Sequence, residues 1–295
     1  MAIGGLTMNA NLDPQRWFTE SYPGQGAALS LETVRKLHEE QSPYQKIEVF
    51  ETANFGRLLT LDGCTMLTTR ENFLYHEMMT HPALFSHPKS ERVLIIGGGD
   101  CGCLLETLRH PGVKHAVQVE LDERVTRVCE QYFPELCASN HDARARLLFE
   151  DGIAYVQHAA PGSFDVVIID STDPVGQAAR LFQAEFYADC RRALGPDGIL
   201  AVQSESPLLH PELIASIHDE MGKAGFTHTA TLPFPQFIYP SGWWSVTHGS
   251  NHRLGVSRER NAAQKSFATR YYNADIHRAA YALPEFLRQA LEKKI

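Results

Sequence analysis

The hydrophobic pattern of the chain changes at about residue 92. Beyond that point, short apolar runs alternate with segments that have the spacing of amphipathic helices. This alternation predicts an α/β fold, with a mostly parallel sheet, helices on both faces and right-handed crossovers. The predicted strands are Val93–Ile96, Ala116–Glu120, Arg146–Phe149, Phe164–Ile169 and Ile199–Gln203, followed by a strand pair, Phe226–Leu232 and Trp243–His248. The predicted helices are Gly102–Arg109, Glu123–Phe133, Gly152–His158, Ala184–Leu194, Pro211–Ala224 and a return to helix within 269–295.

The first part of the chain has a different pattern. Short apolar runs at Lys46–Glu51, Arg57–Leu61 and Cys64–Thr69 are separated by turns containing Asn, Asp and Gly, which predicts antiparallel strands. The composition of Leu31–Glu40 is typical of a helix and predicts one there.

We therefore divide the chain into two domains. Residues 1–70 form a small N-terminal β domain whose first 15 or so residues, poor in apolar side chains, are expected to be frayed. Residues 71–295 form the larger α/β domain, which opens with a predicted helix over Glu71–Ser86.

Composition narrows the class of partner. The 295 residues carry 27 Lys and Arg against 35 Asp and Glu, a net charge of −8 without a run of like charge. This disfavours nucleic acid as a partner and favours a small cationic substrate. No apolar run reaches the roughly 20 residues of a membrane span, and the N-terminus lacks the pattern of a secretory signal. Six cysteines without a CxxC pair indicate reduced thiols and a cytoplasmic location.

Acidic residues follow four successive predicted strands, and this is the strongest chemical signal in the chain. They are Asp100 within the turn GGGDCG, Glu120, Asp151 and Asp170. Ligands of such sheets bind at the carboxyl ends of the strands, so we expect these carboxylates to line one site.

The glycine turn alone does not identify the ligand. GGGDCG satisfies GxGxxG, and Glu120 at the end of the next strand suits a ribose, so a dinucleotide and an adenosyl compound both fit; alternatively, Glu120 could cap the following helix. A carboxylate at Asp100 would repel a pyrophosphate and attract a cation, although it could also cap a helix. Asp151 with Gly152 could accept from an adenine amino group. An adenosyl sulfonium compound is therefore favoured over a dinucleotide.

Two motifs are set aside. The segment HEMMTH, from His76 to His81, resembles a zinc-protease motif, but its histidines are five residues apart and lie on different helix faces, so no metal is expected. Ser171, Ser204 and Ser206 lack the GxSxG context of a nucleophile elbow.

Taken together, these residues make the chain resemble the spermidine synthases of the polyamine aminopropyltransferase family. The resemblance covers nearly everything from Trp17 onward. The motifs are SPYQKIEVFET (42–52), LDG (61–63), ENFLYHEM (71–78), VLIIGGGDCG, VQVELD, EDG, DVVIIDSTDPVG, YPSG (239–242) and YYNADIHRAAYALPEFL (271–287). It implies aminopropyl transfer from decarboxylated S-adenosylmethionine to putrescine, giving spermidine and 5′-methylthioadenosine. It also implies a methyltransferase-like (Rossmann-type) sheet, a homodimer or homotetramer, and no permanently bound cofactor or metal.

The resemblance also assigns roles to residues. For the donor, Gln45 and Glu120 would hold the ribose, Asp151–Gly152 the adenine, and Asp100 with Asp170 the aminopropyl ammonium. The acceptor slot would be lined by Tyr75, His76, Asp170, Asp173, Gln203 and Tyr239. His76 occupies a position that is Gln in some relatives.

Asp170 is the predicted general base. It follows the most apolar strand, VVIID, so it is expected to be partly desolvated. Asp173 would orient the amine, and Trp17, Glu205, Trp243 and Trp244 are candidates for the far wall of the acceptor slot. Asp170 to Phe182 is a candidate lid.

The sequence departs from the family pattern at two positions. Cys101 replaces a glycine of GGGDGG, from which we expect an ordinary negative φ there. Gln177 replaces the proline of a GPA lid, which leaves a contact to the adenine edge in doubt.

Alternative functions remain open. The acceptor could be cadaverine, agmatine or spermidine instead, or the enzyme could methylate putrescine, although Asp100 would oppose the carboxylate of a full methionine tail. A non-catalytic polyamine-binding protein is disfavoured because Asp170 and Asp173 are both present.

Overall fold

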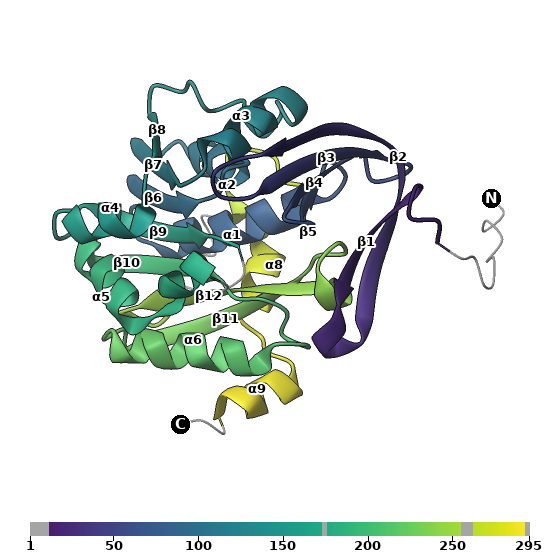
Figure 1. The fold of residues 1–295 in the computed structure, drawn as a ribbon. Helices are drawn as coiled ribbons and strands as arrows, with labels where there is room; N and C mark the ends of the chain where they lie inside the picture. The colour runs from purple at the N-terminus through teal and green to yellow at the C-terminus, as the bar shows by residue number, and fades with distance from the viewer. Residues whose placement is uncertain (1–11, 173–175, 255–261, 293–295) are drawn as a thin grey trace.

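The structure, a computed structural model, describes residues 12–172, 176–254 and 262–292 (Figure 1). Two sheets form its frame. The smaller is antiparallel, in the order β1-β2-β3-β4-β5, with β1 Trp17–Tyr22, β2 Ala27–Gln41, β3 Lys46–Thr52, β4 Arg57–Leu61 and β5 Cys64–Thr68. The larger has the order β11-β12-β10-β9-β6-β7-β8, with β6 Arg92–Gly97, β7 His115–Glu120, β8 Ala145–Phe149, β9 Phe164–Asp170, β10 Leu194–Gln203, β11 His228–Pro235 and β12 Trp243–Ser250.

The predicted α/β architecture is confirmed. Strands β6 to β10 are mutually parallel, and β12 pairs antiparallel with both β10 and β11, as the predicted closing strand pair requires. The helices are α1 Asn72–Ser86, α2 Gly102–Leu108, α3 Glu123–Tyr132, α4 Gly152–His158, α5 Ala184–Ala193, α6 Pro211–Lys223, α8 Ala274–Ala279 and α9 Glu285–Glu292, with 3-10 turns η1 Pro23–Gln25, η2 Gly176–Phe182 and η3 Pro240–Gly242. None of the described helices is long and apolar enough to cross a membrane.

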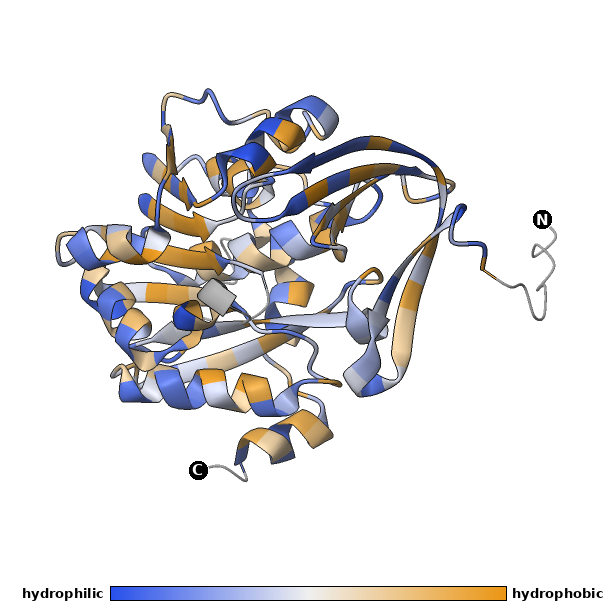
Figure 2. Cartoon of the chain, in the orientation of Figure 1, coloured by the Kyte–Doolittle hydropathy of each residue, from blue (hydrophilic) through white to orange (hydrophobic). Residues whose placement is uncertain are grey.

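The larger sheet is apolar on both faces because helices cover both. Val93 and Ile95 of β6 pack toward α1 and α2, whereas Leu94 and Ile96 pack toward α4, α5 and α6. Figure 2 shows orange bands along these central strands and alternating blue and orange along the covering helices. Burial on both faces explains why the strands read as continuous apolar runs.

The smaller sheet packs on the larger domain through helix α3. Ile47, Val49 and Leu59 from β3 and β4 share an apolar cluster with Val125 and Val128 of α3. Because α3 begins directly after β7, this contact brings the loop between β2 and β3 to the carboxyl edge of the larger sheet.

The helix predicted over Leu31–Glu40 is wrong, because this segment belongs to strand β2. Its apolar residues Leu31, Val34 and Leu37 have the three-residue spacing of a helix. In the structure, the register of β2 against β3 shifts at Val34 and again at Leu37, so two bulges interrupt the alternation of a strand. Pairing with β1 and β3 outweighs the local helical propensity.

Candidate active site

Two adjoining cavities lie at the carboxyl edge of the larger sheet. The larger, of about 740 Å³, is lined by the ends of β6, β7 and β9, the start of α4 and the loop between β2 and β3. The smaller, of about 380 Å³, lies between the β1–β2 hairpin and the end of β10. Both are lined by Cys64, Met66, Tyr75, Ser171, Thr172 and Tyr239.

The glycine turn after β6 brings two acidic side chains together. Gly97 has φ +81°, and a Cβ there would lie 2.2 Å from the carbonyl oxygen of Asp170. Gly98 N donates to that oxygen over 2.8 Å. On the other side of the turn, a Cβ on Gly102 would lie 2.2 Å from the His76 ring. Only glycine at these positions allows β9 and α1 to approach the turn this closely.

The negative φ expected at Cys101 is wrong. Its φ is +67°, in the left-handed region, where it precedes helix α2. The backbone must reverse within the turn, because Cys101 N donates to Gly98 O over 2.8 Å. The buried thiol packs in the apolar cluster of β3, β4 and α3. The turn thus fixes the conformation, and the side chain is accommodated at a cost of about 1–2 kcal/mol.

Asp100 forms an ion pair with His76. His76 Nε2 lies 3.1 Å from Asp100 Oδ2, and Gly102 N donates to Asp100 Oδ1 over 2.7 Å. Burial acts to raise the pKa of Asp100, but the charge of His76 and these hydrogen bonds hold it below its ordinary value. Burial acts to lower the pKa of His76, yet Asp100 and then Asp170 raise it to about 9. The pair is therefore charged at neutral pH.

Asp170 ends the most apolar strand, and its two carboxylate oxygens differ in their hydrogen bonding. Tyr75 Oη donates to Oδ1 over 2.6 Å. No nitrogen or oxygen donor of the described residues bonds to Oδ2, which is buried. Burial first, and then the negative charge of Asp100, raise the pKa of Asp170 above its usual value. A raised pKa makes this carboxylate a stronger proton acceptor than an ordinary aspartate.

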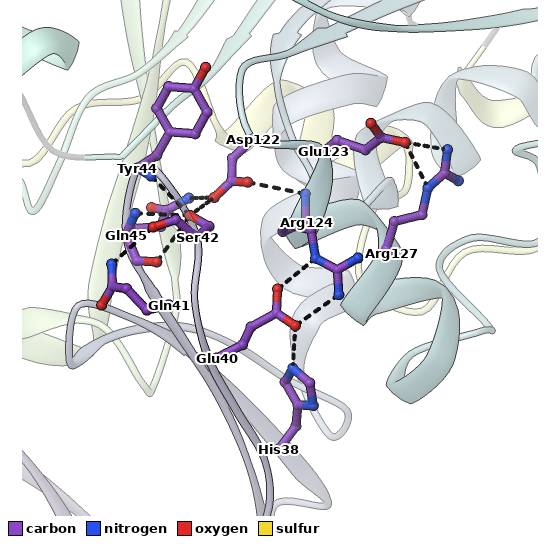
Figure 3. A network of polar contacts seen from close by, with 10 residues as sticks. All are labelled: His38, Glu40, Gln41, Ser42, Tyr44, Gln45, Asp122, Glu123, Arg124 and Arg127. Carbon is purple, nitrogen blue, oxygen red and sulfur yellow. Dashed lines mark hydrogen bonds and ion pairs between the residues drawn. The ribbon is translucent and has the colours of Figure 1, made fainter.

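Glu120 and Gln45 line the larger cavity side by side with Asp122. Asp122 Oδ2 accepts from Gln45 Nε2 over 3.0 Å (Figure 3). Asp122 N donates to Glu120 Oε1 over 2.8 Å. Burial raises the pKa of Glu120 to about 7, and the charge of Asp122 adds to this effect.

Asp151 and Gly152 line the same cavity at the start of α4. Asp151 Oδ1 accepts from Ile153 N over 2.8 Å and so caps the helix. Asp151 therefore both caps helix α4 and lines the larger cavity.

The predicted acceptor residues are divided between the two cavities. Tyr75 and Tyr239 line both, and their rings meet edge to face with centroids 5.8 Å apart. Gln203 lines the smaller cavity. His76 contacts the site through Asp100. Asp173 lies outside the described residues, as does part of the candidate lid.

Glu205 and Trp244, two of the four far-wall candidates, line the smaller cavity. Glu205 is buried at φ +64°, and its Oε2 lies 3.1 Å from His210 Nδ1. Trp243 instead packs on Phe286 of α9, with ring centroids 5.9 Å apart.

Sequence reasoning missed Asp122, Ser42 and Met66. Asp122 directly precedes helix α3, so the sequence signals only a helix cap there. Ser42 and Met66 come from the smaller sheet and its loops, and their place at the site depends on the contact between domains.

A family model described as "Spermine/spermidine synthase domain" matches residues 72–259, and one described as "Spermidine synthase tetramerisation domain" matches residues 16–69. The chain belongs to this family. It is therefore an aminopropyltransferase, as its resemblance predicted.

Relatives of this chain match it in sequence along nearly its whole length. The polyamine aminopropyltransferase of Methylococcus capsulatus is 59% identical over 283 residues, covering 96% of this chain and 99% of the relative. That of Thioalkalivibrio sulfidiphilus is 60% identical over 277 residues, covering 93% and 97%.

Two solved spermidine synthases share the fold. One, in complex with the transition-state analogue AdoDATO, has a TM-score of 0.90 and 34% identity, covering 98% of this chain and 99% of the other. The enzyme of Thermotoga maritima has a TM-score of 0.89 and 33% identity, covering 99% and 100%. The predicted methyltransferase-like sheet with a small N-terminal β domain is thereby confirmed.

Proposed function

We propose that this enzyme transfers the aminopropyl group of decarboxylated S-adenosylmethionine to putrescine, giving spermidine and 5′-methylthioadenosine. The observation that carries the proposal is the partly buried carboxylate of Asp170 in the larger cavity. It accepts a hydrogen bond from Tyr75, and Tyr75 lines both cavities. The complex of a similar spermidine synthase with AdoDATO supports an adenosyl donor.

Electrostatics support cationic substrates. Asp100 and Asp170 are two partly buried acidic groups, and the buried His76 supplies an opposing positive charge. A bound ammonium would offset the remaining negative charge, as buried charges require. Asp100 is proposed to hold the donor's aminopropyl ammonium together with Asp170.

Gln45 and Glu120 are proposed to hold the ribose, and Asp151–Gly152 the adenine, because all of them line the larger cavity. The acceptor would enter the smaller cavity past Gln203 and Tyr239 and present its amine beside Asp170, with Asp173 and His76 as further candidate groups.

The proposed reaction is a direct displacement. The amine nitrogen forms a bond to the aminopropyl carbon next to sulfur, and the C–S bond breaks with its electrons going to sulfur. Methylthioadenosine leaves as a neutral thioether. The amine must be unprotonated to react, and an amine with a pKa of about 10.4 needs about 4.6 kcal/mol for this at pH 7. Asp170 accepts the proton, because its raised pKa favours the protonated form.

A product assay tests the proposal. Purified protein is mixed with the decarboxylated donor and putrescine, cadaverine, agmatine or spermidine, and the products are identified by mass. We expect spermidine and methylthioadenosine, with putrescine as the preferred acceptor. Preference for another amine would overturn the assignment of putrescine as the acceptor. A parallel assay replaces the decarboxylated donor with S-adenosylmethionine. Product formed only with S-adenosylmethionine as donor would indicate methyl transfer and overturn the proposal.

The enzyme is proposed to act as a homodimer or homotetramer, supported by the tetramerisation-domain match over residues 16–69. A cytoplasmic location is proposed because the five buried cysteines, Cys101, Cys103, Cys129, Cys137 and Cys190, are free thiols, as in a reducing compartment.

A further inference from the structure

We infer that Asp122 is a positioning residue for the nucleoside half of the donor: it fixes the Gln45 amide so that the cavity offers the ribose a face made of acceptor oxygens. This inference rests on the proposed function, because it concerns how the proposed donor is recognised.

The carboxylate of Asp122 joins the two domains. The residue is 2% exposed, and its side chain caps helix α3, with Oδ1 accepting from Arg124 N over 3.1 Å. Its other oxygen, Oδ2, accepts from Ser42 Oγ over 2.6 Å and from Gln45 Nε2 over 3.0 Å. Figure 3 shows Ser42 and Gln45 converging on this carboxylate from the loop between β2 and β3.

The contact with Asp122 decides which way the Gln45 amide faces. An ionised carboxylate can only accept hydrogen bonds, so Gln45 must present its NH₂ group to Asp122. The amide oxygen Oε1 is then on the opposite side of the amide group and is available as an acceptor. A neutral partner in place of Asp122 would leave both orientations of the amide possible.

Glu120 completes the acceptor face. It lines the cavity together with Gln45, and its Oε1 accepts from Asp122 N over 2.8 Å. Asp122 therefore holds Gln45 through its side chain and Glu120 through its backbone.

A ribose with two free hydroxyls matches this arrangement, because each hydroxyl can donate one hydrogen bond. The ligand class is therefore a nucleoside with a free cis-diol. A 2′-phosphate would be repelled by the carboxylates of Glu120 and Asp122.

A second contact between the same segments provides a matched control. Arg124 donates to both oxygens of Glu40, over 2.7 and 2.8 Å, and His38 Nε2 lies 3.0 Å from Glu40 Oε2 (Figure 3). Neither Arg124 nor Glu40 lines the cavity. The Arg124 side chain is 51% exposed, so the pair should contribute little to stability.

The test measures binding of methylthioadenosine by titration calorimetry to the full-length wild type, Asp122→Asn, Gln45→Ala, the double variant and Glu40→Gln. Asn still caps α3 but can turn its NH₂ group toward Gln45 and reverse that amide. Asp122→Asn and Gln45→Ala should each bind about tenfold more weakly. The double variant should bind no more weakly than either, because both changes remove the same interaction. Glu40→Gln should stay within about twofold of the wild type.

Analogues of the ligand separate positioning from a general effect on the fold. Two analogues are tested, 2′-deoxy-methylthioadenosine and 3′-deoxy-methylthioadenosine. For at least one of them, Asp122→Asn should bind almost as tightly as the wild type does. Equal losses for all three ligands, or additive losses in the double variant, would overturn the inference. A wild type that does not bind methylthioadenosine would instead overturn the proposed function. Should Asp122→Asn fail to fold, Asp122→Ser, which keeps a capping oxygen without the charge, is expected to give the same pattern.

Discussion

Tyr75 and Asp170 are joined by a hydrogen bond of 2.6 Å that connects helix α1 to the end of strand β9. The bond fixes the carboxylate by Oδ1 alone. Its buried Oδ2 has no nitrogen or oxygen donor among the residues that the structure describes. One oxygen is thus held in place, while the other is the proposed proton acceptor.

The first prediction concerns Asp170→Asn, which keeps the size of the side chain but cannot accept a proton. We expect kcat to fall at least about 100-fold. The affinity for methylthioadenosine, measured by calorimetry, should stay within about threefold. Tyr75→Phe is the matched control, because it removes the hydrogen bond and keeps the carboxylate, and its loss of kcat should be much smaller. Near-normal turnover of Asp170→Asn would exclude Asp170 as the base.

The second prediction concerns the charge of His76. Its pKa is raised from an ordinary 6.5 to about 9, so its ion pair with Asp100 stabilises the fold fully below about pH 6.5. This contribution, about 3 kcal/mol, is lost as pH rises from 6.5 through 9. The free energy of unfolding, measured with urea at pH 6.5, 8 and 9.5, should therefore fall more for the wild type than for His76→Gln. Parallel pH profiles of the two proteins would show that His76 is neutral in the folded state.

The third prediction concerns Glu120, whose pKa burial raises to about 7. The proposed contact of Glu120 with both ribose hydroxyls requires the ionised carboxylate, so the affinity for methylthioadenosine should rise about tenfold from pH 6 to pH 8. Glu120→Gln should remove this rise. Glu71 is the matched control, because burial also raises its pKa to about 7, yet it does not line the larger cavity. A pH profile that changes in Glu71→Gln and persists in Glu120→Gln would contradict the assignment.

The fourth prediction concerns the conformation of Cys101, at φ +67°. Substitution by Gly or by Ala removes the thiol. Only Ala keeps a Cβ, which destabilises the left-handed backbone conformation. Cys101→Gly should therefore be more stable than Cys101→Ala by about 1 kcal/mol in urea unfolding. At Cys190, in the interior of helix α5, the order should reverse, because glycine disfavours a helix by about 1 kcal/mol relative to alanine. The same order at both positions would argue against strain at Cys101.

The sequence predicted the elements that carry the chemistry. Parallel strands buried on both faces appear as continuous apolar runs, so β6 and β9 could be found from hydropathy alone. Their carboxyl ends must share one edge of the sheet. Hence the sequence alone predicts that Asp100, Glu120 and Asp170 lie close together.

Tertiary structure decided what depends on contacts between distant segments. Leu31–Glu40 is a strand because neighbouring strands supply hydrogen bonds that outweigh helical propensity. Cys101 is left-handed because the turn must close.

What the sequence by itself determined is the sheet, the acids at its edge and the family. Only the tertiary structure decided how those acids are oriented: Tyr75 reaches Asp170 from 95 residues away, and Gln45 reaches Asp122 from 77. The physical reason is that apolar periodicity and helix caps are local properties of a chain. The direction of a carboxylate or an amide, in contrast, is set by hydrogen-bond partners that only folding brings within reach.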